Sequence, residues 1–153
     1  METDCINSVL RRAESQDIPR IIELVWQNVE EGPYKRQIVF NQTTLRAFVG
    51  ALLADEQARV LVYEHEWIQG VFAFTTFPNF YYFAGQIVAS MVVWSVAKKF
   101  RGRASIKLLK EGQKAAKELG AKYMLLTGPT ASFDGLCEHC GYSFLESSFI
   151  KEL

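Results

Sequence analysis

The sequence predicts a single α+β domain over residues 1–153, built on one mixed, mostly antiparallel β-sheet flanked by helices. Some segments have apolar residues at helical spacing, and other segments have the alternation or the β-branched and aromatic content of strands. The strand-like segments in the middle of the chain follow one another without a helix, which is typical of antiparallel pairing. A later helical segment separates two strand-like segments, which predicts one parallel pair. The length suits one domain with its own core.

The N-terminal part predicts one short strand and an amphipathic helix. Residues 8–13 (SVLRRA) form the extended segment. Ser15 or Asp17 caps a helix that begins near Ile18, with Pro19 in its first turn. Apolar residues recur in this helix at helical spacing: Ile18, Ile21, Ile22, Val25 and Trp26.

A second helix is predicted after a break in the chain. Gly32 and Pro33 interrupt the helical pattern, and Thr43 or Thr44 caps a helix that runs to about Ala54. One face of this helix is apolar and carries Leu45, Phe48, Val49 and Leu52.

Three strands are predicted in the middle of the chain. Residues 59–64 and 67–77 are rich in β-branched and aromatic residues and are separated by a short turn, which predicts an antiparallel hairpin. Residues 86–97 predict a third long strand, with a bulge near Ala89 and Ser90.

The remaining elements follow in the C-terminal part. Residues 103–119 predict a helix that ends at Gly120 as its C-terminal cap. Residues 122–128 predict a short parallel strand, residues 130–140 a short helix, and residues 142–153 a closing strand. The predicted order is β-α-α-β-β-β-α-β-α-β.

The composition argues against several classes of protein. Lys and Arg number 17 and so do Asp and Glu, so general attraction to nucleic acid or to an anionic membrane is not expected. The long uncharged stretch over residues 67–95 is interrupted by Gly, Pro, Asn and Gln, which indicates buried strands rather than a membrane span. Three cysteines and a polar start without a signal peptide indicate a reducing cytoplasm.

A basic stretch with one glycine lies where a predicted strand becomes a helix. Lys98, Lys99, Arg101 and Arg103 surround Gly102. The unpaired N–H groups and positive dipole end of a helix start bind phosphate, and nearby cations strengthen that binding. The glycine lets a ligand approach the backbone closely. The stretch predicts a diphosphate cradle, with a solvated basic turn as the alternative.

The run WSVAKKFRGRA is followed by a helix, by ELGAKYMLL and by a short helix ending in CGYSF. This arrangement resembles the GNAT superfamily of acyl-CoA-dependent N-acetyltransferases. The element order resembles the family over essentially the whole chain, whereas the sharp motif covers residues 94–109. The resemblance implies transfer of an acetyl group from acetyl-CoA, the co-substrate, to an amine by direct attack in a ternary complex. A catalytically inert GNAT-like module for CoA binding, structure or interaction is the alternative.

The resemblance also implies cofactor-binding residues. Trp94, Ser95 and Val96 would lie on the strand whose backbone pairs with the pantetheine arm. The pyrophosphate loop would comprise Arg101, Gly102, Arg103, Ala104 and Ser105. The sequence departs from the family pattern at Lys98, where proline is common, and at Ala104 and Ile106, near the usual later glycines.

The catalytic residues follow from the resemblance less directly. It implies a Glu base on the central strands and a Tyr acid four residues before the closing glycine. Here residues 67–110 contain no Asp or Glu, and Cys137 stands four residues before Gly141. Cys137 is the candidate acid, because a thiol of ordinary pKa can protonate a thiolate. A small packed core residue is the alternative interpretation.

Further candidates lie outside the motif. Glu31, beside Glu30, is a candidate base after the first helix, or part of a solvated acidic turn. Ser95, with Ser90, is a candidate to order a water or polarise the thioester carbonyl, or a packed strand residue. The spacing of His139 and Cys140 does not favour a metal site.

An aromatic group suggests where the acceptor lies. Tyr34, Phe77 and residues 80–83 predict an aromatic acceptor pocket or its cover, with ordinary core or a homodimer face as alternatives. The sequence does not indicate whether the acceptor amine belongs to a small molecule, a peptide or a protein.

Overall fold

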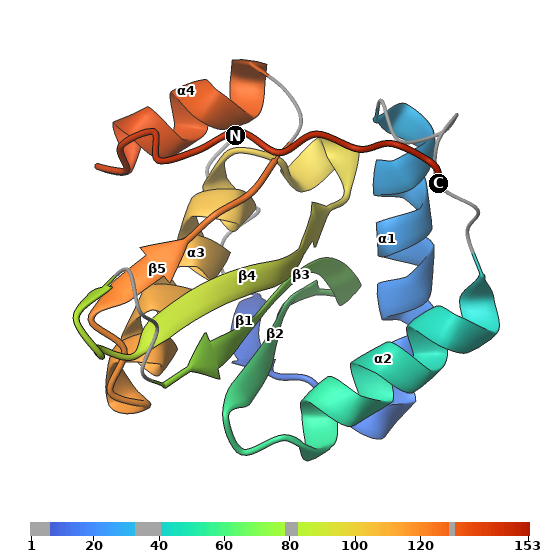
Figure 1. Cartoon of the computed structure of the whole chain (residues 1–153). Coiled ribbons are helices and arrows are strands. Elements are labelled where there is room, and N and C mark those ends of the chain that lie inside the picture. Colours follow the sequence, from blue (N-terminus) through green and yellow to red (C-terminus); the bar gives the residue numbers. More distant parts are fainter. Residues whose placement is uncertain (1–6, 33–40, 79–82, 129–130) are drawn as a thin grey trace.

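A computed structural model of the chain describes residues 7–32, 41–78, 83–128 and 131–153, with side chains except those of residues 131 and 132. The helices and strands, in chain order, are β1 (Ser8–Arg12), η2 (Ser15–Asp17), α1 (Ile18–Glu31), α2 (Gln42–Ala54), β2 (Ala58–His65), β3 (Trp67–Phe77), β4 (Val88–Val96), η5 (Lys98–Phe100), α3 (Arg103–Glu118), β5 (Tyr123–Leu125) and α4 (Ala131–His139), where η marks a short 3-10 helix. Figure 1 shows their arrangement.

The described strands form one five-stranded sheet in the order β1-β2-β3-β4-β5. Neighbouring strands are antiparallel except β4 and β5, which are parallel and joined through α3. α1 and α2 pack on one face of the sheet and α3 packs on the other. The α+β class and the single parallel pair predicted from the sequence are confirmed.

The two faces of the sheet hold separate cores, because side chains of a strand alternate. In β3, Val71 and Ala73 belong to the core under α1 and α2, whereas Phe72 and Phe74 belong to the core under α3. A Cβ at Gly112 of α3 would overlap the ring of Phe72. The glycine therefore lets α3 lie close against the sheet.

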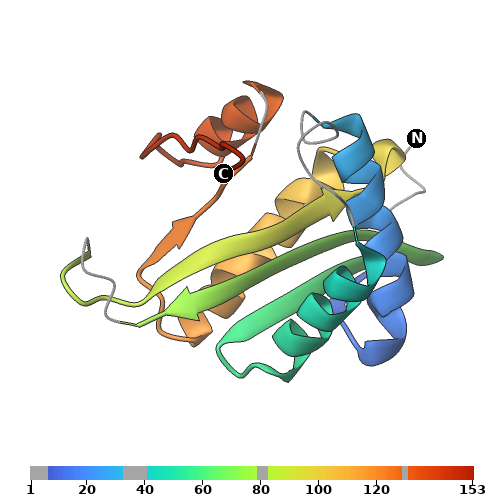
Figure 2. The same ribbon diagram turned by 45° about the vertical axis from the view of Figure 1, so that its right-hand side comes forward.

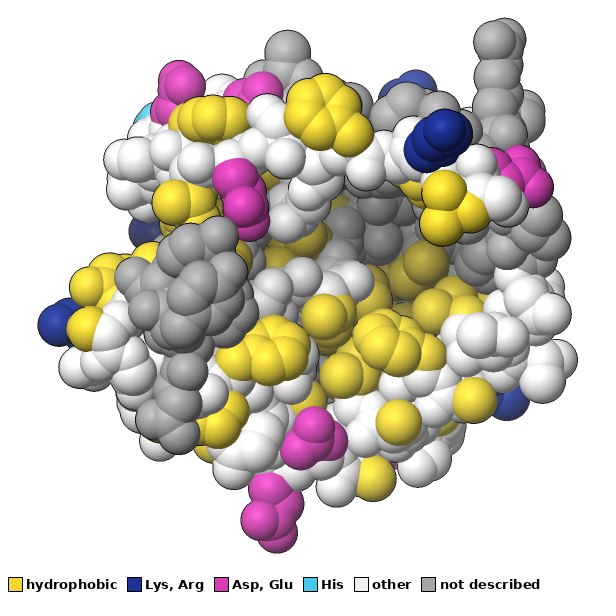
Figure 3. Space-filling view, viewed as in Figure 1, with side chains coloured by type: hydrophobic (Ala, Val, Ile, Leu, Met, Phe, Trp, Pro, Cys, Tyr) yellow, Lys and Arg dark blue, Asp and Glu magenta, His cyan; other side chains and the backbone are white. Residues whose placement is uncertain are grey.

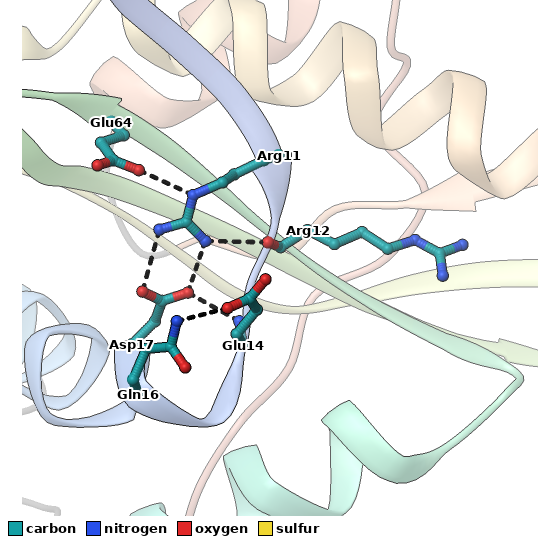
Figure 4. A network of polar contacts seen from close by, with 6 residues as sticks. All are labelled: Arg11, Arg12, Glu14, Gln16, Asp17 and Glu64. Atoms are coloured by element: carbon teal, nitrogen blue, oxygen red, sulfur yellow. Dashed lines mark hydrogen bonds and ion pairs between the residues drawn. The ribbon is translucent and has the colours of Figure 1, made fainter.

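A polar network joins β1 to the start of α1 (Figure 4). Arg11 donates through Nη1 and Nη2 to both carboxylate oxygens of Asp17, at 2.7 and 3.1 Å, and through Nε to Glu64, at 2.8 Å. The N–H of Glu14 also donates to Asp17, at 2.7 Å. The hydrogen bonds from Arg11, with the N–H of Glu14, hold the pKa of the buried Asp17 below its usual value although burial opposes this.

Helix α2 begins earlier than predicted. Asn41, rather than Thr43 or Thr44, is its N-cap, and the side-chain oxygen of Asn41 accepts from the N–H of Thr44 at 2.9 Å. Asparagine ranks above threonine as an N-cap residue, and here its side chain satisfies a backbone N–H of the first turn.

The strand predicted over residues 142–153 is not formed. Only Tyr142 packs inward, with its hydroxyl accepting from Gln113 Nε2 at 2.7 Å, whereas Phe144 and Leu145 are exposed. A strand needs a hydrogen-bonded neighbour. The edge strand β5, predicted over seven residues, spans only Tyr123–Leu125, and it pairs with no part of this segment.

Candidate functional site

Strands β4 and β5 diverge inside the motif region. Their pairing ends at Ser90 and Leu125, while β4 continues to Val96 (Figure 2). Beyond Ser90 no described strand pairs with the outer edge of β4. Along this edge the carbonyl of Trp94 accepts only a long hydrogen bond, 3.5 Å, from Asn28 Nδ2 of α1. The divergence leaves this edge of β4 without a described strand partner, so its backbone groups are available to an extended ligand.

A β-bulge interrupts β4 at the same place. Ala73 of β3 pairs with Val93 and Phe74 pairs with Met91, so Val92 is the extra residue. The predicted bulge near Ala89 and Ser90 is therefore placed wrongly, because its position depends on the register with β3. A bulge leaves backbone groups unpaired and turns side chains outward, and Val92 is 37% exposed.

The strand-to-helix junction has the geometry of an anion site. Gly102, the N-cap of α3, has φ of 90° and no side-chain cap, so the first N–H groups of α3 lack partners. A Cβ at Gly102 would meet no atom within 4 Å, so the positive φ, rather than space, favours glycine. Arg103 is exposed, whereas Ala104 and Ser105 are buried.

Arg101 connects the junction to α1. Its Nε donates to the carbonyl of Val96 at 3.0 Å, and its Nη2 lies 2.5 Å from Oε2 of Glu31. Glu31 is the last residue of α1 rather than part of a loop. The structure thus brings together a predicted cofactor residue and the predicted base, a pairing that no local sequence pattern indicates. The charges of Lys98, Lys99 and Arg103 stay without a described ion-pair partner.

Trp94 lies between the sheet and α4. Its ring packs edge-on against Phe72, with centroids 5.6 Å apart, and against Phe133 of α4, at 5.8 Å. The indole Nε1 is buried without a hydrogen-bond partner among the described residues. Buried donors are rarely left unpaired, so this N–H is a candidate donor to a ligand beside β4. The tryptophan alone did not indicate this role.

Cys137 lies one turn after Phe133 on α4, which places both residues on the same side of the helix. It is half-buried, and burial, with smaller effects of Cys140 and Asp134, raises its pKa to about 11. The thiol is therefore protonated at neutral pH, but it is a weaker acid than the ordinary thiol that sequence reasoning assumed.

The other predicted residues occupy varied environments. Ser95 is 4% exposed, and the alternation of β4 places it on the side of Val93, under α1. Phe83 contacts the ring of Tyr123 at 4.8 Å, and Phe77 is exposed. The predicted aromatic residues Tyr34, Phe80, Tyr81 and Tyr82 lie outside the described residues.

Other features of the described part of the chain lie apart from the junction. Two surface pockets, of about 470 and 350 Å³, contain no residue of the 94–105 stretch. No three His, Cys, Asp or Glu side chains within the described ranges are grouped as metal ligands would be. Among the helices described, none has the length and apolar character to cross a membrane.

Comparison with known proteins finds similarity in fold but none in sequence families. No protein-family model matches the sequence, and no curated protein matches it. Among solved structures, a predicted acetyltransferase with acetyl-CoA from Clostridium acetobutylicum superposes with a TM-score of 0.77 at 15% identity, over 95% of this chain and 96% of that one. Glucosamine-6-phosphate N-acetyltransferase from Arabidopsis thaliana superposes with a TM-score of 0.74 at 17% identity, over 95% of this chain and 98% of that one.

A GNAT family acetyltransferase from Staphylococcus aureus gives a TM-score of 0.70 at 16% identity, over 97% of this chain and all of that one. At these identities the likeness concerns the fold. The likeness extends over nearly the whole of each chain. The chain therefore has the fold of the GNAT-family acetyltransferases.

Proposed function

We propose that the chain is an N-acetyltransferase that uses acetyl-CoA and transfers the acetyl group to an amine in a ternary complex. One observation supports this most: β4 separates from β5 shortly before a glycine-capped helix start with exposed cations. The unpaired edge of β4 suits an extended thioester arm, and the helix start suits the diphosphate at its end.

The reaction needs three groups around the thioester. The amine nitrogen, as the free base, attacks the carbonyl carbon and forms the C–N bond while the C–S bond breaks. The amine gives up one proton to a base, and the CoA thiolate takes one proton from an acid. The carbonyl oxygen needs hydrogen-bond donors while it carries negative charge, and the backbone at the Val92 bulge is proposed to supply them.

Glu31 is the proposed base, and its contact with Arg101 makes this role depend on the cofactor. While Arg101 holds Glu31, the carboxylate is engaged. A diphosphate at the start of α3 offers Arg101 a stronger anionic partner and releases Glu31 toward the acceptor. Cys137 is the proposed acid, and buried Ser95 is proposed to support the backbone around the thioester carbonyl.

The second candidate function is a GNAT-like module that binds CoA without catalysis. Two observations favour it: residues 67–110 contain no carboxylate, and the raised pKa of Cys137 weakens it as an acid. Turnover distinguishes the two functions, since both require CoA binding.

The test of cofactor binding is thermal and calorimetric stabilisation by acetyl-CoA. At a hundred times its Kd the ligand adds about 2.7 kcal/mol to the free energy of unfolding. Arg103→Glu should remove most of this gain by placing negative charge beside the diphosphate. The apo protein should stay stable, because an acidic residue favours a helix start. Lys110→Glu, the same charge change farther along α3, is the matched control.

The test of transfer is release of CoA in the presence of amines. Release should depend on both substrates, and mass spectrometry should detect the acetylated amine. Acetyl-CoA binding without acetylation of any amine would favour the inert module. Absence of stabilisation by millimolar acetyl-CoA would overturn both functions.

A further inference from the structure

Helices α1 and α2 do not reach every part of the sheet face on which they pack. α1 packs on β3 and β4, with Asn28 near its end reaching Trp94, whereas α2 packs on β2. In both ribbon views neither helix crosses the first half of β4 (Figures 1 and 2). Val88 at the start of β4 is buried, with 1% of its surface exposed. The residues of these two strands that remain accessible from this side are therefore those next to it, at the end of β3 and after Val88 in β4.

The side chains on this half-face follow from strand alternation. Ala73 lies in the core under α1 and α2, so Thr75 and Phe77 point to the same side. Ser90 pairs with Thr75 and shares that side. Phe77 is 45% exposed, and Thr75 and Ser90 are half-buried. With the exposed Val92, these residues form what we call the neutral strip: Thr75, Phe77, Ser90 and Val92.

The two strands that form the neutral strip carry no charge, and α2 carries little, whereas α1 carries Arg20, Glu23, Glu30 and Glu31. β3 and β4 contain no Asp, Glu, Lys or Arg, and Arg46 is the only one of these in α2. α2 also presents Phe48, which is 42% exposed beside its buried stripe. In the view of Figure 3, hydrophobic side chains gather between α2 and β4, and acidic side chains border this patch.

The neutral strip adjoins the place proposed for the thioester. Ser90 belongs to the last residue pair between β4 and β5, and the bulge at Val92 follows directly. A ligand on the strip would therefore reach the diverging edge of β4 with one end. An amine on that end would face the carbonyl carbon, while the rest of the acceptor would lie over the strip.

We infer that the acceptor is a primary amine carried by an uncharged apolar group, of the arylalkylamine type, with that group on the neutral strip. The inference rests on the proposed acetyl transfer and names its acceptor class. Binding is favoured when the apolar surface of the acceptor is removed from water on the strip. A second charge on the acceptor, anionic or cationic, would lose water there without a partner on the strip, which is costly. The attacking nitrogen itself reacts as the neutral amine.

The first experiment compares kcat/KM for 2-phenylethylamine, spermidine and L-aspartate. Wild type should prefer 2-phenylethylamine at least tenfold over each of the others. Thr75→Asp should lower this preference over spermidine at least tenfold, because the new carboxylate attracts a second ammonium. Thr75→Asn, of the same size without the charge, should change the ratio less than threefold. A wild-type preference for spermidine or aspartate, or equal ratios for the Asp and Asn variants, would overturn the inference.

The second experiment locates the amine without requiring catalysis. In protein labelled at Thr and Val methyl groups, 2-phenylethylamine should shift the resonances of Thr75 and Val92, while spermidine at the same concentration should not. Unchanged methyl resonances at 10 mM 2-phenylethylamine would overturn the inference even if acetyl-CoA binds. Shifted methyls without any binding of acetyl-CoA would instead leave the apolar site standing and refute the proposed transfer.

Discussion

The two halves of the candidate site are assembled differently. The cofactor half is one continuous stretch, in which the end of β4, η5, Gly102 and the start of α3 follow each other along the chain. The acceptor half draws on α1, β3 and β4, and its parts meet only through the sheet. The cofactor half carries cations, whereas the neutral strip carries none. A site for a charged diphosphate and a site for an apolar amine would differ in this way.

The largest effect is expected at Cys137 of α4, the proposed acid. Cys137→Ala should lower kcat about 10²-fold, the lower end of what general acid catalysis contributes, with acetyl-CoA affinity unchanged. Since the pKa is raised to about 11, the thiol keeps its proton through neutral pH, and wild-type activity should not fall from its loss below about pH 10. Cys140→Ala is the matched control. Full activity of Cys137→Ala would remove the thiol from the mechanism.

A change in the scaffold should weaken folding and leave both halves alone. Asp17→Asn removes the charge-assisted hydrogen bonds from Arg11 and should cost about 2 kcal/mol in the free energy of unfolding at pH 7. The lowered pKa of Asp17 stabilises the fold above the ordinary carboxyl pKa of about 3.9, and this is lost as the pH falls through the folded value.

Urea unfolding at pH 7 and pH 3 measures the difference between wild type and Asp17→Asn. The gap in stability should narrow at the lower pH, while acetyl-CoA affinity at pH 7 should be the same for both proteins. A gap that does not depend on pH would show that the charge of Asp17 is not what stabilises this junction.

Gly102 tests whether the cofactor half depends on its backbone conformation. Gly102→Ala must adopt a positive φ that costs about 1–3 kcal/mol or else move the loop, and acetyl-CoA affinity should fall about tenfold. Gly50→Ala, in the interior of α2, is the control, and it should stabilise the protein by about 0.5–1 kcal/mol. Calorimetric titration measures the affinity. An unchanged affinity in Gly102→Ala would separate the glycine from the diphosphate site.

The difference between the halves also explains what the sequence could predict. The junction was recognisable because its glycine and cations are neighbours in the chain, and their meaning depends on a local strand-to-helix change. The predicted position of the bulge, near Ala89 and Ser90, differs from the observed one at Val92 because the partner strand decides the register. The contact of Arg101 with Glu31 joins distant segments, so neither residue's surroundings indicate the other.

The prediction of a closing strand over residues 142–153 is wrong for a related reason. Alternation in residues 142–153 is a local property, but a strand forms only where a partner edge is available. The described edge of β5 is three residues long, and Phe144 and Phe149 stay exposed. The local sequence pattern therefore predicts helices and hairpin strands well, because their hydrogen-bond partners are close in the chain. It predicts poorly a strand whose partner edge comes from a distant segment.

The smallest expected effect tests whether the Trp94 indole serves the cofactor half. In the free protein its buried Nε1–H lacks a described partner, which is unfavourable by about 1–3 kcal/mol. Trp94→Phe keeps an aromatic ring against Phe72 and Phe133 and removes the donor. If a ligand oxygen accepts from Nε1, the variant should bind acetyl-CoA about fivefold more weakly while its apo stability falls little or rises.

A loss of affinity without a matching loss of apo stability distinguishes a ligand contact from simple packing, for which stability and affinity would fall together. Calorimetric titration and urea unfolding of the same preparations measure both quantities. Phe133→Leu is the control for packing, because it loosens the contact with Trp94 without touching the donor. If Trp94→Phe binds acetyl-CoA as tightly as wild type, the indole N–H faces no cofactor oxygen, and the thioester arm must lie elsewhere along β4.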